Sequence, residues 1–107
     1  MREIHAHDFE DFITKNRVAV VDFWAPWCSP CIAMEPALKR IEEGARDIAF
    51  AKLNVDENPE VARDYGVMSI PTLIVFINGR EMDRIIGSQS EDALRDRLSN
   101  YSGSFSP

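Results

Sequence analysis

Cysteine is scarce in this sequence: Cys28 and Cys31 are the two cysteines among its 107 residues. Two cysteines are too few for the disulfide scaffold of many small secreted domains, so a hydrophobic core must stabilise the fold. The chain is long enough for one core, because a domain of this length buries roughly 60–70% of the surface that its unfolded chain exposes. Its 45% apolar and 28% charged residues are typical of one soluble globular domain spanning residues 1–107.

The sequence also lacks long apolar runs and an excess of basic charge. Its most apolar segments are interrupted by Asp22, Lys52 and Asn78, so none is long enough to span a membrane. The 12 Lys and Arg residues against 18 Asp and Glu residues give a net charge of −6, which argues against binding to nucleic acid or to an anionic membrane surface. Residues 1–8 lack the apolar core of a signal peptide. We therefore expect a cytoplasmic protein, whose thiols are kept reduced.

Strand-like and helix-like patterns of apolar residues alternate along the chain. Strands are predicted at 3–5, 18–24, 48–55, 72–77 and 80–86, with helices after the first, second, third and fifth of them. This βαβαβαββα order indicates an α/β fold in three layers, a central mixed five-stranded sheet with helices on both faces. Helical connections make the first three strands parallel, and Asn78-Gly79 predicts a hairpin that adds an antiparallel edge. Residues 102–107 are predicted to be a frayed, flexible tail.

Capping residues mark where three of the helices begin. Asp8 is expected to cap the first helix, and Asn58 followed by Pro59 opens the third. The residues Ser88-Gln89-Ser90-Glu91 form a capping-box pattern before the last helix.

The two cysteines lie in the segment WCSPC, residues 27–31, where the second strand ends and the second helix begins. Pro30 suits the first helical turn, because its fixed φ is helical and its missing N–H would be unpaired there. Cys28 is therefore expected at the helix start, with Cys31 one turn later on the same face. Cβ atoms three residues apart in a helix are about 5–6 Å apart and a disulfide needs about 3.5–4.5 Å, so a small adjustment joins the sulfurs.

A helix start favours a thiolate over a thiol, because its unpaired N–H groups and the positive end of the helix dipole stabilise negative charge. We therefore expect Cys28 to be ionised, open to solvent and the nucleophile that attacks a substrate disulfide. Cys31, more buried, is expected to resolve the mixed disulfide. The sequence predicts a thiol–disulfide oxidoreductase that reduces protein disulfides and needs no cofactor.

Asp22 stands in an apolar strand where both faces should be buried, so its carboxyl is costly to ionise. We expect it to accept the proton of the Cys31 thiol during the second step. The alternative is a buried structural partner for Lys52, which interrupts the neighbouring strand. The two roles are compatible.

The cysteine pair has alternative roles that stay open at this point. It could be half a zinc site with His5 and His7, although no second ligand pair has the usual spacing, or it could be an inert pair in the core. A glutaredoxin or a protein of the disulfide-isomerase kind would use similar chemistry. A binding module with incidental cysteines is a function of a different class.

Four segments together resemble the thioredoxin family: VDFWAPWC at 21–28, KLNVD at 52–56, IPT at 70–72 and NG at 78–79. The resemblance covers nearly the whole chain. It implies a cis peptide bond before Pro71, beside the two sulfurs, and an Ile70 backbone that pairs with an extended substrate segment. It also implies a flat apolar docking surface around Cys28, Trp24 packed behind the active site, and a buried pair of Asp22 with Lys52. The implied docking residues are Trp27, Pro30, Ile70, Pro71 and Gly87.

The same resemblance implies partner proteins and identifies positions at which this sequence differs from the family's common pattern. The implied partners are disulfide-containing protein substrates and a thioredoxin reductase that recycles the oxidised form, and nothing in the sequence points beyond a monomer. Ser29 stands where the common motif has Gly, and the residues between the cysteines influence the reduction potential. Ile32 and Met68 stand where the family often carries basic residues. These two residues make the rim of the active site less cationic and more apolar. We expect this rim to narrow the set of partner proteins that the active site accepts.

Overall fold

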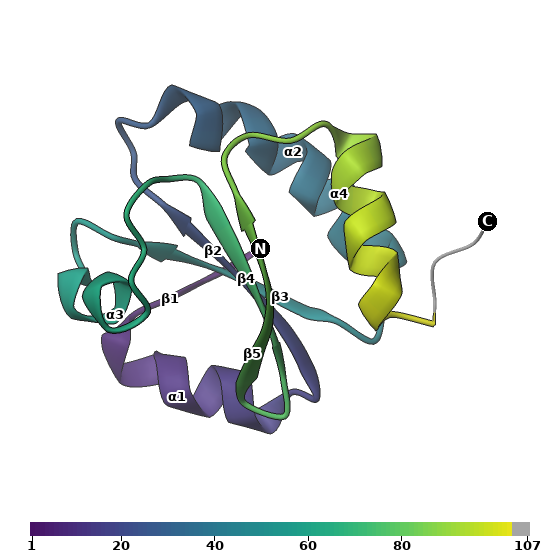
Figure 1. Cartoon of the computed structure of the whole chain (residues 1–107), viewed down its shortest axis with the longest axis horizontal. Helices are drawn as coiled ribbons and strands as arrows, with labels where there is room; N and C mark the ends of the chain where they lie inside the picture. The colour runs from purple at the N-terminus through teal and green to yellow at the C-terminus, as the bar shows by residue number, and fades with distance from the viewer. Residues whose placement is uncertain (104–107) are drawn as a thin grey trace.

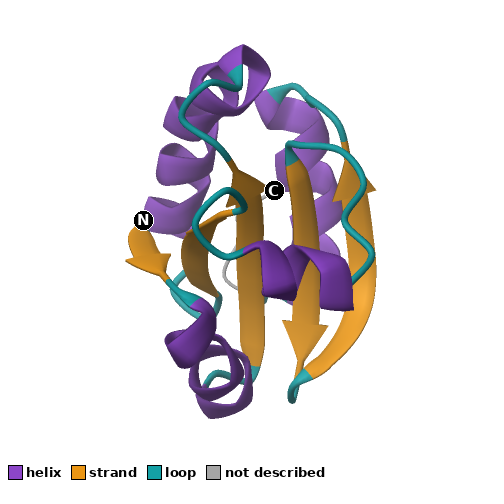
Figure 2. Cartoon of the chain, turned by 90° about the vertical axis from the view of Figure 1, so that its left-hand side faces the viewer, coloured by secondary structure: helices purple, strands orange, loops and turns teal. Residues whose placement is uncertain are grey.

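The centre of the sheet is β2 (Val18–Trp24), a strand that is buried along nearly its whole length. A strand with apolar side chains on both faces needs cover on both sides, and two layers of helices provide it (Figures 1 and 2). The computed structural model describes residues 1–103. The other strands are β1 (Arg2–Ile4), β3 (Ala49–Asn54), β4 (Thr72–Ile77) and β5 (Arg80–Ile86). The helices are α1 (Ala6–Lys15), α2 (Ser29–Gly44), α3 (Pro59–Asp64) and α4 (Glu91–Leu98), and a 3₁₀ turn covers Ser99–Tyr101.

The strands lie in the order β1-β3-β2-β4-β5. The predicted α/β fold with a mixed five-stranded sheet is confirmed, and β1, β2 and β3 are parallel as expected. Antiparallel pairing begins inside the sheet, because β4 runs antiparallel to β2 as well as to β5. The length of α3 explains this direction: six residues of helix span about 9 Å, whereas a seven-residue strand spans about 23 Å. The chain therefore enters β4 at the carboxyl end of β2, close to the start of α2.

Two apolar cores lie on opposite faces of the sheet. Side chains alternate along β2, so Val18 and Val20 face one core while Val21 and Phe23 face the other. The first core is completed by α2 and α4 through Met34, Leu38, Ile41, Leu94 and Leu98. The second is completed by α1 and α3 through Phe9, Phe12, Ile13 and Val61.

Two of the predicted caps are wrong by a few residues. The N-cap of α1 is His5, and Asp8 lies in the first turn, where its carboxylate accepts the His5 backbone N–H at 3.0 Å. The N-cap of α4 is Ser90, whose Oγ accepts the Ala93 backbone N–H at 3.1 Å. In both cases a side-chain oxygen binds an N–H group at the helix start, but the capping residue was assigned to the wrong position.

The β4–β5 hairpin turns at Asn78-Gly79, as predicted. Both residues have positive φ, 51° and 81°, which is the conformation that a tight two-residue hairpin turn needs and that Asn and Gly tolerate best. The pairing of β4 with β5 shifts its register between Val75 and Phe76.

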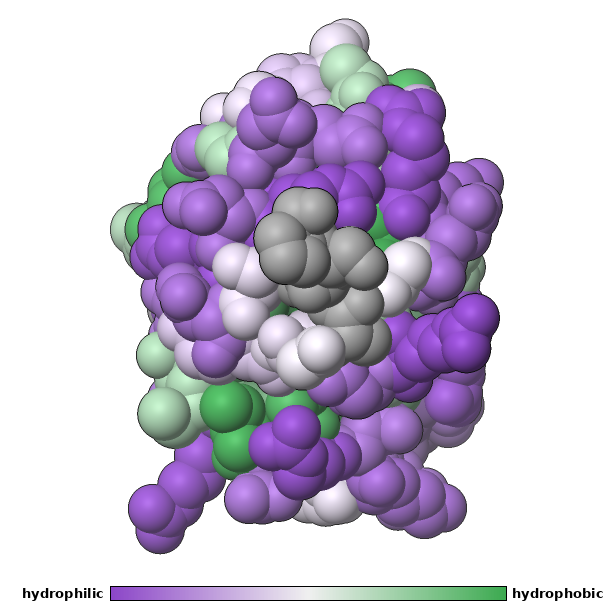
Figure 3. Space-filling view, turned by 90° about the vertical axis from the view of Figure 1, so that its right-hand side faces the viewer, coloured by the Kyte–Doolittle hydropathy of each residue, from purple (hydrophilic) through white to green (hydrophobic). Residues whose placement is uncertain are grey.

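The side of the molecule on which α4 lies is mainly hydrophilic (Figure 3).

Two residues of the predicted flexible tail, Ser102 and Gly103, are bound to the rest of the fold. The Ser102 hydroxyl and the Gly103 backbone N–H both donate to the Asp47 carboxylate. Residues 104–107 lie outside the described part of the chain. No helix among residues 1–103 is long and apolar enough to cross a membrane.

Candidate active site

The cysteine pair lies between β2 and α2. Cys28 is the N-cap residue of α2, and Cys31 lies in its first turn, after Pro30. The two sulfurs form a disulfide, with Cα atoms 5.3 Å apart. The Cys28 sulfur also accepts a hydrogen bond from the Cys31 backbone N–H at 3.3 Å, one of the N–H groups that a helix start leaves without a partner. The predicted position of Cys28 at the positive end of a helix is confirmed.

Both sulfurs are nearly covered in this disulfide form. Cys28 is 5% exposed and Cys31 is 2% exposed. The expectation that Cys28 is open to solvent is therefore wrong for this state, although Cys31 is the more buried of the two. The cause is the apolar shell around the pair, formed by Ala25, Trp24, Val55 and Ile70.

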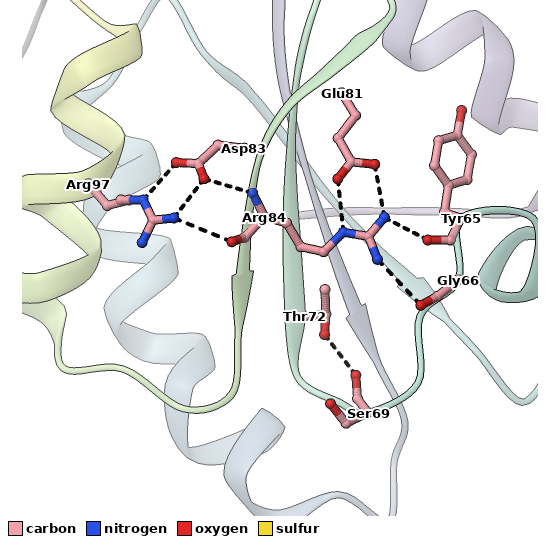
Figure 4. Close-up of polar contacts among 8 residues, drawn as sticks. All are labelled: Tyr65, Gly66, Ser69, Thr72, Glu81, Asp83, Arg84 and Arg97. Atoms are coloured by element: carbon pink, nitrogen blue, oxygen red, sulfur yellow. Dashed lines mark hydrogen bonds and ion pairs between the residues drawn. The ribbon is translucent and has the colours of Figure 1, made fainter.

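The peptide bond between Ile70 and Pro71 is cis, as the resemblance implied. Ile70 packs against the cysteine cluster. Hydrogen bonds hold the backbone on both sides of this bond: Pro71 accepts the Gly87 N–H at 2.9 Å, and the Thr72 hydroxyl donates to the Ser69 carbonyl at 2.7 Å (Figure 4).

The segment that leads to Pro71 is fastened to β5 at its other end. The Arg84 guanidinium donates to the Tyr65 carbonyl at 2.6 Å and to the Gly66 carbonyl at 3.4 Å (Figure 4). Glu81 orients the same guanidinium through two 2.8 Å hydrogen bonds. This bidentate pairing fixes the plane of the Arg side chain, so the segment from α3 to β4 is supported at both of its ends.

An apolar groove of about 310 Å³ lies beside the cysteines. Trp27, 68% exposed, borders it, and its indole N–H donates to the Asp56 carboxylate at 2.6 Å. Met68 is 95% exposed. Of the residues expected to form the docking surface, Trp27 and Ile70 line this groove, whereas Pro30, Pro71 and Gly87 are not among its lining residues. The groove is lined by Trp27, Val55, Ala62, Val67, Met68, Ser69 and Ile70.

Asp22 is 2% exposed, and its Oδ1 accepts no hydrogen bond from any described residue. Burial raises the pKa of Asp22 to about 7, and the nearby Glu35 carboxylate acts in the same direction, while Lys52 opposes both. A carboxyl group with such a pKa can take up or release a proton near neutral pH.

Asp22 and Lys52 interact electrostatically, since Lys52 acts to lower the pKa of Asp22, but the carboxylate in ion-pair contact with Lys52 is that of Glu35. The two residues are in register on neighbouring strands, but the Lys52 ammonium lies 3.0 Å from the Glu35 carboxylate. It also lies 4.3 Å from the centre of the Trp24 ring, a cation–π contact. Glu35 on α2 takes the ammonium because a partly exposed carboxylate is less costly to ionise than one in the core.

A model of the thioredoxin family matches residues 1–100. The chain belongs to the thioredoxin family. It is 45% identical to "Thioredoxin" of Alicyclobacillus acidocaldarius over 94 residues, 87% of this chain and 90% of that protein. It is 44% identical to "Bifunctional thioredoxin reductase/thioredoxin" of Mycobacterium leprae over 93 residues, which is 86% of this chain and 20% of that longer protein.

The fold of this thioredoxin-family chain also matches that of a solved thioredoxin structure. A mutant thioredoxin of Halobacterium salinarum superposes with a TM-score of 0.89 at 36% identity, over 99% of this chain and 93% of that one. The protein is a protein-disulfide oxidoreductase of the thioredoxin type, with Cys28 and Cys31 as its redox-active disulfide.

His5 and His7, weighed as zinc ligands with the cysteine pair, lie at the start of α1 with stacked rings. Their side chains are 45% and 81% exposed. Within residues 1–103, no group of three or more His, Cys, Asp and Glu side chains is placed to hold a metal ion.

Sequence reasoning missed Glu35 and Arg84. Glu35 could have been found, since it follows Cys31 by four residues and so lies on the same face of α2. Arg84 gave no comparable signal, because the partners that make it important are backbone carbonyls of residues 18 and 19 positions away in the chain.

The raised pKa of Asp22 makes stability depend on pH. Between pH 4 and 7 the folded protein holds a proton on Asp22 that the unfolded chain has lost, so the contribution of Asp22 to the free energy of unfolding falls as pH rises through this window. We expect Asp22→Asn to abolish this fall, and to leave the variant more stable than wild type at pH 8 by about 2–4 kcal/mol. Urea denaturation at pH 4 and pH 8 measures it; parallel pH dependence in both proteins would contradict the account.

Proposed function

We propose that this thioredoxin-type protein reduces protein disulfides through a mixed disulfide on Cys28. The Cys28 thiolate attacks one sulfur of the substrate disulfide and the other sulfur leaves as a thiolate. The Cys31 sulfur then attacks Cys28, which releases the second substrate thiol and leaves the Cys28–Cys31 disulfide. The carrying observation is the position of Cys28 at the N-terminus of α2, where its sulfur accepts the Cys31 N–H.

Asp22 serves in this proposal as the proton acceptor for the Cys31 thiol during the second step. Its burial and its pKa of about 7 support the assignment, because an acid–base group is most effective when its pKa is near the working pH. Lys52, in register with Asp22, contributes positive charge that partly offsets the cost of ionising it.

Substrate binding is proposed in the groove between Trp27 and Met68. An extended substrate segment pairs with the backbone of Ile70, and its side chains contact the exposed indole of Trp27. The packing of Ile70 against the cysteine cluster and the hydrogen bond from the Gly87 N–H to Pro71 support this role, since they place the Ile70 backbone beside the sulfurs.

Partners and compartment are also proposals. The oxidised form is recycled by a thioredoxin reductase, which the fused Mycobacterium leprae relative supports by its name. The protein works in the cytoplasm, and its net charge of −6 supports a role that does not involve binding to nucleic acid or to an anionic membrane surface. We propose one domain over residues 1–107, active as a monomer, with Trp24 and Ser29 in supporting positions around the pair.

Replacing Cys31 by Ser separates this proposal from a binding module with incidental cysteines. Without the resolving thiol, we expect Cys28 to stay covalently bound to substrate, so mixed disulfides accumulate and insulin reduction with dithiothreitol falls to background. Non-reducing gels followed by mass spectrometry identify the trapped proteins, and a Cys28→Ser, Cys31→Ser double variant is the control. A double variant with full biological activity would support the binding module instead, and activity confined to a glutathione-coupled assay would support a glutaredoxin.

Replacing Asp22 by Asn tests the proton acceptor. We expect slower release of substrate from the mixed disulfide, because the amide cannot accept the Cys31 proton, while the first attack by Cys28 keeps nearly its wild-type rate. Stopped-flow measurement of both phases resolves the two steps. Equal release rates for the variant and wild type would remove Asp22 from the reaction.

Introducing Ile32→Lys and Met68→Arg tests the apolar rim. Both side chains are exposed, at 47% and 95%, so the changes disturb no core. We expect the double variant to change its turnover with a given thioredoxin reductase, because charge on a rim alters the rate of encounter with a partner. Met82→Arg, at an exposed position on β5, is the matched control. An unchanged KM and kcat would show that the rim does not select partners.

A further inference from the structure

Three charged residues from three elements interact with one another. Asp22 comes from β2, Lys52 from β3 and Glu35 from α2, one turn after Cys31. In-register neighbours on parallel strands point to the same face of the sheet, so the Lys52 side chain has Asp22 beside it. It nevertheless reaches Glu35 at 3.0 Å.

Lys52 contacts both Glu35 and Trp24, whereas one carboxylate oxygen of Asp22 has no hydrogen-bond partner among the described residues. The Lys52–Glu35 pair is partly shielded from water, with side chains 17% and 20% exposed, and the Trp24 ring covers the ammonium at 4.3 Å. Asp22 keeps an Oδ1 that no described residue hydrogen-bonds. A carboxylate buried without a partner is costly to ionise, so any group that draws Lys52 away also makes Asp22 hold its proton more tightly.

The charged groups that face Asp22 are few. From α2 there is Glu35, and from β3 there is Lys52. From β4 the residue in register is the apolar Leu73, and α4 contributes Leu94 and Leu98 to this core. In the reduced protein the Cys31 thiol of α2, one turn before Glu35, is a further titratable group. The Lys39 ammonium lies 4.0 Å from the Glu35 carboxylate.

We propose that Glu35 is a positioning residue for the redox reaction: by holding the Lys52 ammonium, it limits how far Lys52 neutralises Asp22 and so keeps Asp22 a strong enough base to take the Cys31 proton. This inference rests on the proposed function and adds a residue to it. In the second step the proton moves from the Cys31 sulfur to the Asp22 carboxylate. The Cys31 sulfur then bonds to Cys28, the bond from Cys28 to the substrate sulfur breaks, and the substrate leaves as a thiolate.

The direct test is the titration of Asp22 in the oxidised protein, in which the cysteines do not titrate. Carboxyl ¹³C NMR of labelled aspartate follows the group in wild type, Glu35→Gln and Glu43→Gln. Glu43 is an exposed residue of the same helix, so its variant is matched in charge. We expect Glu35→Gln to lower the midpoint by about one pH unit or more, and Glu43→Gln to leave it unchanged. An unchanged midpoint in Glu35→Gln, or an equal shift in Glu43→Gln, would overturn the proposal.

A double variant separates an effect through Lys52 from a purely direct one. If Glu35 acts by holding the ammonium, the shift caused by Glu35→Gln shrinks when Lys52 is already replaced by Met. A full-sized shift in the Lys52→Met background would overturn this route.

Kinetics connect the titration to the reaction. Stopped flow follows the release of thionitrobenzoate from the mixed disulfide on Cys28 between pH 5 and 9. In Glu35→Gln we expect the rise of the release rate to move to lower pH together with the Asp22 midpoint, and the plateau to fall because Asp22 is a weaker base. A midpoint that moves while the release profile stays in place would overturn the role of Glu35 in the reaction. Failure of the proposed function itself is a separate result, since wild type would then not reduce insulin.

Discussion

The interaction on which the site depends is between one sulfur and the start of a helix. Cys28 caps α2, and its sulfur receives the Cys31 backbone N–H at 3.3 Å. A helix start offers unpaired N–H groups and the positive end of a dipole, so it stabilises negative charge on that sulfur more than on one within the helix. The sequence places Pro30 in the same turn, where it does not interrupt hydrogen bonding. The same local geometry keeps Cys31 close enough to form the disulfide without movement of the sheet.

The rest of the fold brings a second segment to that sulfur. The short α3 cannot carry the chain back across the sheet, so β4 starts at the end where β2 finishes. Ile70 and Pro71 consequently lie beside the cysteines. The Gly87 N–H donates to Pro71, and the Arg84 guanidinium donates to the Tyr65 and Gly66 carbonyls at the other end of the segment (Figure 4). A reactive pair on one element and a docking backbone on another are thus set next to each other by the direction of a single strand.

Much of this architecture could be predicted from the sequence, because its signals are local. The apolar run at β2, the turn at Asn78-Gly79 and the proline after Cys28 each determine structure within a few residues. Errors arose where two local solutions compete, as with Asp8 and Ser88, where the N-cap is another residue two or three positions away. The burial of Cys28 was missed because it depends on apolar side chains that the fold gathers from three separate segments.

The charged residues under the site show the limit of such reasoning most clearly. Burial of Asp22 follows from its strand, but the choice of Lys52 between Asp22 and Glu35 depends on a helix packed above two strands. Two partners compete for one ammonium, and only the three-dimensional arrangement decides between them. The reactive sulfur is a local property of the chain, whereas its proton chemistry is a property of the packed fold.

The most direct test of the central claim is the reactivity of the two thiols in the reduced, native protein. Alkylation by iodoacetamide at pH 7, followed by peptide mass spectrometry, gives a rate for each cysteine. The account predicts that Cys28 reacts faster than free cysteine and much faster than Cys31, because the thiolate at the helix start is the reactive form. Two thiols that are both unreactive at neutral pH, or a faster Cys31, would contradict it.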